Sequence, residues 1–178
     1  MSSVENIVSE IEKWSDEFDL GLPKTWEELQ RLNLIKVWNG SSKITYIPDA
    51  IAYLPNLRGL ILDNEKISQI PNIIGNLKSL QDLNLSFNSI MMIPNSITQL
   101  RNLKNLDLCC NKLTSLPVSF GNLQSLRKVN LCCNKLYSLP KSIKQLTNLK
   151  ELNLYNNPLS TSEKEKAEKL LPGVDITF

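Results

Sequence analysis

The chain has 178 residues, and its 20 Lys or Arg residues against 18 Asp or Glu residues give a formal net charge of +2. This near balance provides no general attraction to nucleic acid or to an anionic membrane surface. The chain lacks histidine, a P-loop and a G-x-G-x-x-G motif, which argues against an enzyme, a bound nucleotide or any other cofactor.

The first 14 residues have neither the basic start nor the continuous apolar run of a secretory signal. No stretch of the sequence is apolar over the length of a membrane span. We therefore expect a cytoplasmic monomer. The alternative is secretion by a route without a recognisable signal peptide.

Residues 4–18 carry apolar side chains at helical spacing, with acidic residues on the other faces. The apolar set consists of Val4, Ile7, Val8, Ile11, Trp14 and Phe18. The pattern predicts an amphipathic helix with one buried stripe. We interpret residues 1–21 as an N-terminal cap for the segment that follows.

Prolines recur every 23 residues, at positions 48, 71, 94, 117 and 140. Each turn follows the frame P-x-x-I-x-x-L-x-x-L-x-x-L-x-L-x-x-N-x-L-x-x-L, and residues 22–159 contain six such turns. Two turns depart from the frame: Glu65 stands where Asn belongs, and two extra residues lie within 38–43. A period in the twenties with this template indicates a solenoid of stacked turns.

The L-x-x-L-x-L part of the frame alternates with period two, which is typical of a short strand with one buried face. Stacked turns then form a parallel sheet on the concave side of a curved rod, with strands about 4.8 Å apart. The Asn residues should form a buried ladder that binds backbone groups of neighbouring turns. Its members are Asn88, Asn111, Asn134 and Asn157.

Residues 160–178 resemble a second cap. Ser162-x-x-Glu165 has the pattern of a capping box, residues 164–171 read as a short helix, and Pro172-Gly173 ends it. Val174, Ile176 and Phe178 alternate, which predicts a final strand. With both ends covered, we expect one complete structural domain.

The frame resembles the 23-residue leucine-rich repeats of plant intracellular Ras-group proteins, animal scaffolds and bacterial proteins. The ending Asn156-Asn157-Pro158-Leu159-Ser160, followed by a charged helix, is similar to bacterial members. The resemblance covers roughly residues 22–178. It implies an α/β solenoid that binds a protein partner through the concave strand face, and it implies no catalytic residues.

The positions that the frame leaves free should line this face in columns, giving small polar side chains in the middle, a basic edge and aromatic residues near the ends. The predicted partner-binding residues are Lys36, Trp38, Arg58, Ile61, Asp63, Asp82, Asn84, Lys104, Asp107, Arg127, Lys128, Asn130, Lys150, Asn153 and Tyr155. The plainer alternative is a solvated polar face without a partner. Asp82 and Asp107 on neighbouring strands could also imitate a catalytic carboxylate pair, which we do not favour.

Two Cys-Cys pairs, 109–110 and 132–133, occupy the same positions in adjacent turns. Cys109 and Cys132 should lie about one strand spacing apart, within reach of a disulfide. A zinc site is disfavoured because neighbours along a strand point apart. Reduced structural cysteines, a disulfide or redox-sensitive site, and a metal site remain open.

Three functions are compatible with these observations. The first is a protein-binding module that acts as a scaffold, adaptor or inhibitor. The second is a secreted, host-directed or envelope-associated bacterial binder that uses the same face. The third is a redox- or metal-responsive protein that uses the paired cysteines.

Overall fold

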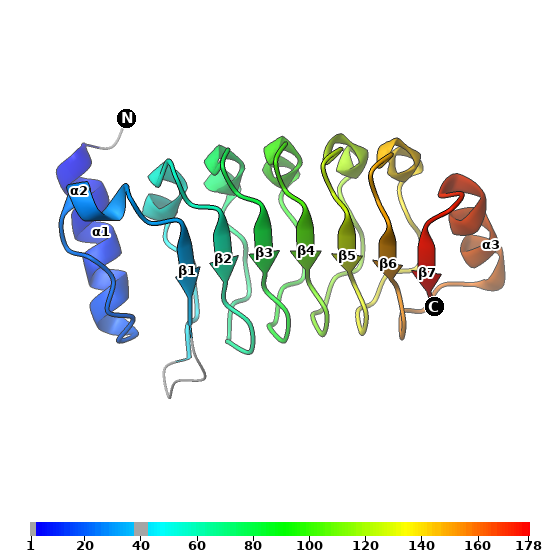
Figure 1. Cartoon of the computed structure of the whole chain (residues 1–178). Coiled ribbons are helices and arrows are strands. Elements are labelled where there is room, and N and C mark those ends of the chain that lie inside the picture. Colours follow the sequence, from blue (N-terminus) through cyan, green and yellow to red (C-terminus); the bar gives the residue numbers. More distant parts are fainter. Residues whose placement is uncertain (1–2, 38–42) are drawn as a thin grey trace.

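The computed structural model describes residues 3–37 and 43–178, which form a row of similar turns (Figure 1). Seven strands make one parallel sheet, and their order in the sheet is their order in the sequence. The strands are β1 (Leu34–Lys36), β2 (Gly59–Ile61), β3 (Asp82–Asn84), β4 (Asn105–Asp107), β5 (Lys128–Asn130), β6 (Glu151–Asn153) and β7 (Asp175–Thr177). The predicted α/β solenoid with a parallel sheet is confirmed.

The middle residue of each strand points towards the core. Leu106, at the centre of β4, is 2% exposed, whereas Asn105 and Asp107 on either side face outward. The backbone ladder continues beyond the strands, since the N–H of Leu108 donates to the carbonyl of Asn130 at 2.9 Å. From β2 to β6 each strand residue pairs with the residue 23 positions later, as in Asp107 with Asn130, so the repeat length fixes the register there. The offset is 25 between β1 and β2, as in Lys36 with Ile61, and 24 between β6 and β7.

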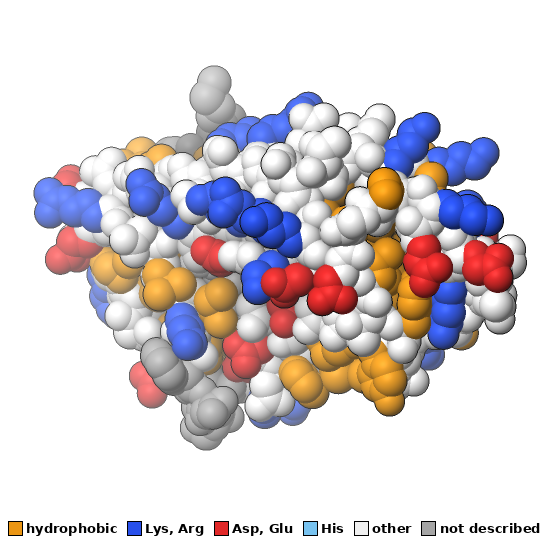
Figure 2. Space-filling model, turned by 45° about the vertical axis from the view of Figure 1, so that its right-hand side comes forward, with side chains coloured by type: hydrophobic (Ala, Val, Ile, Leu, Met, Phe, Trp, Pro, Cys, Tyr) orange, Lys and Arg blue, Asp and Glu red, His pale blue; other side chains and the backbone are white. Residues whose placement is uncertain are grey.

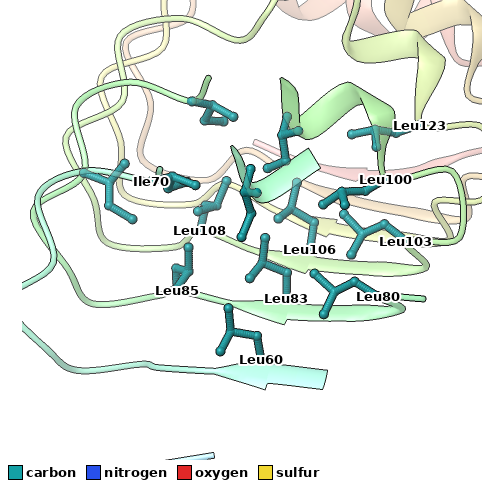
Figure 3. Close-up of a cluster of buried hydrophobic side chains, with 14 of the residues drawn as sticks. Leu60, Ile70, Leu80, Leu83, Leu85, Leu100, Leu103, Leu106, Leu108 and Leu123 are labelled. Atoms are coloured by element: carbon teal, nitrogen blue, oxygen red, sulfur yellow. The ribbon is translucent and has the colours of Figure 1, made fainter. Parts of the chain in front are cut away.

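The opposite wall of each of five turns contains a short 3₁₀ helix. These helices are Asp49–Tyr53, Asn72–Asn76, Asn95–Gln99, Phe120–Asn122 and Lys141–Gln145. Four of them begin directly after a proline, whose fixed φ and missing N–H suit a position with no hydrogen-bond acceptor. Side chains from strands and return segments meet in one core, in which Leu60, Leu83 and Leu106 stack from turn to turn (Figure 3).

The predicted asparagine ladder is present. The side-chain oxygens of Asn88, Asn111, Asn134 and Asn157 each accept a backbone N–H of the preceding turn, at 2.8–3.0 Å. Glu65 takes over the acceptor role in its turn, because its Oε2 accepts the N–H of Ile44 at 2.7 Å. Burial raises the pKa of the Glu65 carboxyl. The charged carboxylate is therefore less stable at this position than a neutral amide would be.

Two helices lie at the N-terminal end of the sheet: α1 (Val4–Glu17) and α2 (Trp26–Leu29). Helix α1 begins after Ser3, whose side chain accepts the N–H of Asn6. The predicted apolar stripe packs against the core except for Val4, which is 46% exposed at the first residue of the helix. Trp14 is fully buried, and its indole N–H donates to the carbonyl of Tyr46 at 3.0 Å. The predicted two-residue insertion within 38–43 lies almost entirely outside the described residues.

At the other end, helix α3 (Thr161–Leu170) precedes β7. The predicted capping residue is wrong: Ser160, not Ser162, caps the helix, and its hydroxyl accepts the N–H of Glu163 at 3.2 Å. The chain is still extended at Ser160, next to the buried Leu159, so the helix can begin one residue later. Strand β7 pairs with β6 and continues the sheet, as predicted.

Candidate functional site

A shallow hollow of about 430 Å³ lies on the face of the sheet that points away from the core, which we call the strand face. It is lined by residues of β2 to β6. Seven predicted site residues line it together, namely Ile61, Asp82, Asn84, Asp107, Lys128, Asn130 and Asn153. The hollow also includes Asn105 and Glu151, which the prediction left out although they occupy the repeat positions of Asp82 and Lys128.

The other predicted residues lie around this hollow. Lys36 ends β1, at the far N-terminal side of the same row, and Trp38 lies outside the described residues. Asp63 and Tyr155 follow their strands. The remaining four directly precede theirs: Arg58, Lys104, Arg127 and Lys150.

One row of polar residues across the strand face also stabilises the backbone where each strand ends. The side-chain oxygens of Asn84, Asp107, Asn130 and Asn153 each accept the backbone N–H two residues later, at 2.9–3.3 Å. These bonds fix the exit of each strand, as Asx turns do. The sequence signal is an Asn or Asp at the same repeat position in four successive turns. Part of the polarity of this row therefore serves the fold and is not free for a partner.

Side chains of neighbouring strands also bind one another across the strand face. Asn105 Nδ2 donates to Asp82 at 2.5 Å, and Asn130 Nδ2 donates to Asp107 Oδ2 at 3.1 Å. The Nζ of Lys128 lies 2.7 Å from a carboxylate oxygen of Glu151, with both side chains more than half exposed. An ion pair this exposed stabilises by little, so a partner could exchange with either member at small cost.

The strand register does not support a catalytic carboxylate pair. Asp82 stands opposite Asn105, and Asp107 stands opposite Asn84. The two carboxylates are thus diagonal neighbours, and each already accepts an amide hydrogen bond. The arrangement is that of a hydrogen-bonded polar surface.

The basic edge of the strand face is held by the backbone. The carbonyl of Arg58 accepts two N–H groups of the next turn, from Gln81 at 2.8 Å and Asp82 at 2.9 Å, and later turns repeat this pattern. Lys104 is half-buried and donates to Gln81 Oε1 at 2.9 Å. In the described part of the chain, no side-chain partner occurs for Arg58, Arg127 or Lys150. Figure 2 shows Lys and Arg side chains in a row across the upper half of the view, with acidic side chains below part of it.

Non-glycine residues adopt a left-handed backbone conformation at the same position of five turns. They are Asn64, Phe87, Cys110, Cys133 and Asn156, with φ between 53° and 59°. This conformation turns the chain sharply after each strand and changes the direction in which the side chain points. Phe87 is 56% exposed as a result, and it adds an apolar group beside the strand face, as does the 57% exposed Tyr155.

The cysteines depart from the expected alternation. Cys109 and Cys132 form a disulfide with Cα atoms 4.7 Å apart, so the disulfide alternative describes this pair and the reduced one does not. Cys110 and Cys133 are free and half-buried. Neighbours were predicted to point apart, but the left-handed backbone at Cys110 places its Sγ only 3.4 Å from that of Cys109. Burial, and secondarily the neighbouring Cys133 and Asp107, raise the pKa of the Cys110 thiol.

The repeating turns and the single parallel sheet define a leucine-rich-repeat solenoid. The family model for a leucine-rich repeat region matches residues 26–173, and the chain belongs to this family. No curated protein matches the chain in sequence. Among the described residues, no helix is both long and apolar enough to cross a bilayer.

Three solved structures illustrate the likeness. A leucine-rich-repeat protein of Leptospira interrogans is 39% identical with a TM-score of 0.81, over 85% of this chain and 38% of that one. An internalin of Listeria monocytogenes is 27% identical with a TM-score of 0.63, over 76% and 38%. The ectodomain of the Arabidopsis thaliana receptor kinase GASSHO1/SCHENGEN3 is 32% identical with a TM-score of 0.62, over 69% and 15%. The chain thus spans well under half the length of each.

Proposed function

We propose that the chain binds a protein partner through the strand face and acts as a scaffold, adaptor or inhibitor. Leucine-rich repeats are a common protein-binding fold, and the plant ectodomain above was solved in complex with CASPARIAN STRIP INTEGRITY FACTOR 2. The observation that carries the proposal is the hollow over β2 to β6, bordered by basic side chains on a rigid sheet. In this proposal the binding unit is a monomer.

The chemistry of the face favours an extended or protruding segment that carries acidic side chains. Arg127 and Lys150 are exposed beside the hollow and can pair with carboxylates of a partner. The exposed ring of Tyr155, beyond the other end of β6, would become an anchor once water is excluded. Within the hollow, the amides of Asn84 and Asn153 can donate to a partner backbone while their oxygens stay on the chain.

The test is an affinity capture followed by titration of the captured partner. Arg127→Glu combined with Lys150→Glu should weaken the complex and alter its salt dependence, because both changes oppose an acidic segment. The matched control is Lys141→Glu with Lys144→Glu, which reverses two exposed charges on the return helix of the turn that contains Lys150. Equal binding by both double variants would remove the strand face from consideration.

A second candidate rests on the disulfide. Disulfides persist in oxidising compartments and are rare in the cytosol, so the Cys109–Cys132 bond favours a secreted or envelope-associated binder over the predicted cytoplasmic one. Alkylation of the protein in intact producing cells distinguishes the two. Two reactive thiols per chain support the exported form, and four support the cytoplasmic form.

A further inference from the structure

Cys109, Cys110, Cys132 and Cys133, which we call the four-cysteine cluster, follow the neighbouring strands β4 and β5. The Sγ atoms of Cys109, Cys110 and Cys133 all lie within 4.8 Å of one another. The fourth sulfur, of Cys132, is bonded to that of Cys109. No other group of three or more Cys, Asp or Glu ligand atoms is this close in residues 3–37 and 43–178.

The backbone holds this arrangement independently of the disulfide. The sheet register places Cys132 next to Cys109 because each turn repeats after 23 residues. The N–H of Cys110 donates to the carbonyl of Cys132 at 2.9 Å, and the N–H of Cys133 donates to the carbonyl of Tyr155 at 2.8 Å. These bonds fix the left-handed turns that swing both free thiols back towards the bonded pair. Opening the disulfide would therefore leave four thiols on a largely fixed frame.

We propose that the reduced four-cysteine cluster is a binding site for one thiophilic d¹⁰ cation, with Zn²⁺ as the ion that it suits. Zinc–sulfur bonds are about 2.3 Å long, so the sulfurs of a tetrahedral site lie roughly 3.8 Å apart. Among Cys109, Cys110 and Cys133, the separations of 3.4 Å and up to 4.8 Å need only small side-chain rotations to reach that value. The sulfur of Cys132 must in addition move away from that of Cys109 once their bond is reduced. Thiolate sets of this kind select zinc or copper(I) over calcium and magnesium.

The site has two exclusive chemical states. A dithiol reductant supplies two electrons to the Cys109–Cys132 bond; it leaves as a disulfide, and two thiols appear on the chain. Binding of Zn²⁺ then displaces one proton from each of the four thiols. In the oxidised chain two of the four ligands are tied to each other, so the complete site does not exist.

Neighbouring groups suit a metal thiolate. Only Cys109 is fully buried, and the other three are half-buried, so an ion can reach the sulfurs from solvent. Asn156 Nδ2 lies 3.6 Å from the Sγ of Cys133, in position to donate a hydrogen bond to a coordinated sulfur. Such outer partners orient ligands and typically contribute about 10–100-fold to metal affinity.

The experiment uses the full chain after reduction with a phosphine, removal of the reductant under inert gas, and titration with Zn²⁺ against a chromophoric chelator. We expect one Zn²⁺ per reduced chain, none per oxidised chain, and a cadmium–thiolate absorbance band when Cd²⁺ replaces zinc. The double variant Cys110→Ser with Cys133→Ser should lose more than about 100-fold in affinity, beyond the effect of an outer partner. Asn156→Ala should lose about 10–100-fold.

The double variant keeps the Cys109–Cys132 disulfide in its oxidised form, and circular dichroism of both the oxidised and the reduced variant establishes that the titrated form folds. The wild-type chain adds a second readout, because zinc that binds only the folded state raises the thermal midpoint of the reduced form. A folded, reduced wild-type chain that binds no Zn²⁺ would overturn the proposal. Equal affinity of the double variant would do so as well. Either result leaves the binding function of the strand face untouched.

Discussion

Replacing Asn111 with Ala tests the internal ladder at one of its buried links. The side chain is 8% exposed, and its Oδ1 accepts the N–H of Ile90 at 2.9 Å. Its Nδ2 donates to the carbonyls of Leu85, Leu108 and Cys109. The substitution removes all of these bonds at once without changing a charge.

The magnitude follows from which groups are left without a partner. The three carbonyls each keep another donor: Leu85 and Leu108 retain the amides of Asn88 and Asn134, and Cys109 retains a backbone N–H. Only the buried N–H of Ile90 is orphaned. A buried unsatisfied donor costs about 1–3 kcal/mol, which is the destabilisation that we expect.

Equilibrium urea unfolding of both proteins in the oxidised state measures this loss as a lower midpoint at unchanged slope. The matched control is Asn157→Ala, because Asn157 makes the same contacts, including 3.0 Å to the N–H of Leu136, but is half-buried. Water can replace its side chain, so its cost should stay below about 1 kcal/mol. Equal or inverted costs for the two variants would refute the argument from burial.

Three further predictions concern the first cap, the irregular turn and the left-handed position. Trp14→Ala should lower the unfolding free energy by about 3–5 kcal/mol, because the side chain is fully buried and hydrogen-bonded. Glu65→Gln should raise it at neutral pH, because the folded-state pKa of Glu65 lies above its unfolded value and the carboxylate is penalised. The gain should shrink as the pH falls and Glu65 becomes protonated. Phe87→Asn should stabilise by a few tenths to about 1 kcal/mol, since Asn tolerates a φ of 55° better than Phe.

Thermal and urea unfolding check all three, each against its own control. Trp26→Ala changes a tryptophan that is only partly buried and should cost less than Trp14→Ala. Glu168→Gln, on the exposed face of α3, changes the same residue type where the side chain lies in solvent and should leave the unfolding free energy at neutral pH nearly unchanged. Tyr137→Asn removes an exposed aromatic residue that lacks a positive φ and should not stabilise. A Glu65→Gln gain that grows on acidification would show that the carboxylate helps the fold.

The 23-residue spacing was enough to predict the sheet, its register and the asparagine ladder, because a periodic frame repeats the same burial in every turn. It did not reveal the left-handed position, since Phe87 and Cys110 are not residues that ordinarily indicate a positive φ. The start of α3 was missed because Ser160, Thr161 and Ser162 are all acceptable caps, and the packing of Leu159 selects the first. The sequence also did not show that Asn84, Asp107, Asn130 and Asn153 bind the backbone N–H two residues later, because those hydrogen bonds depend on how the chain turns after each strand.

The single covalent link changes how the row of turns can open. Each strand is bonded only to the strands beside it, so unravelling can begin at either end and advance turn by turn. The Cys109–Cys132 bond closes a 23-residue loop that joins β4 to β5, near the middle of the row. Fraying that starts at β7 or at α1 meets this clamp before it can pass into the other arm. In the oxidised chain the turns on either side of the disulfide can therefore unravel separately, and the backbone amides of β4 and β5 should exchange hydrogen slowly. After reduction, unravelling can pass through the centre from one end to the other.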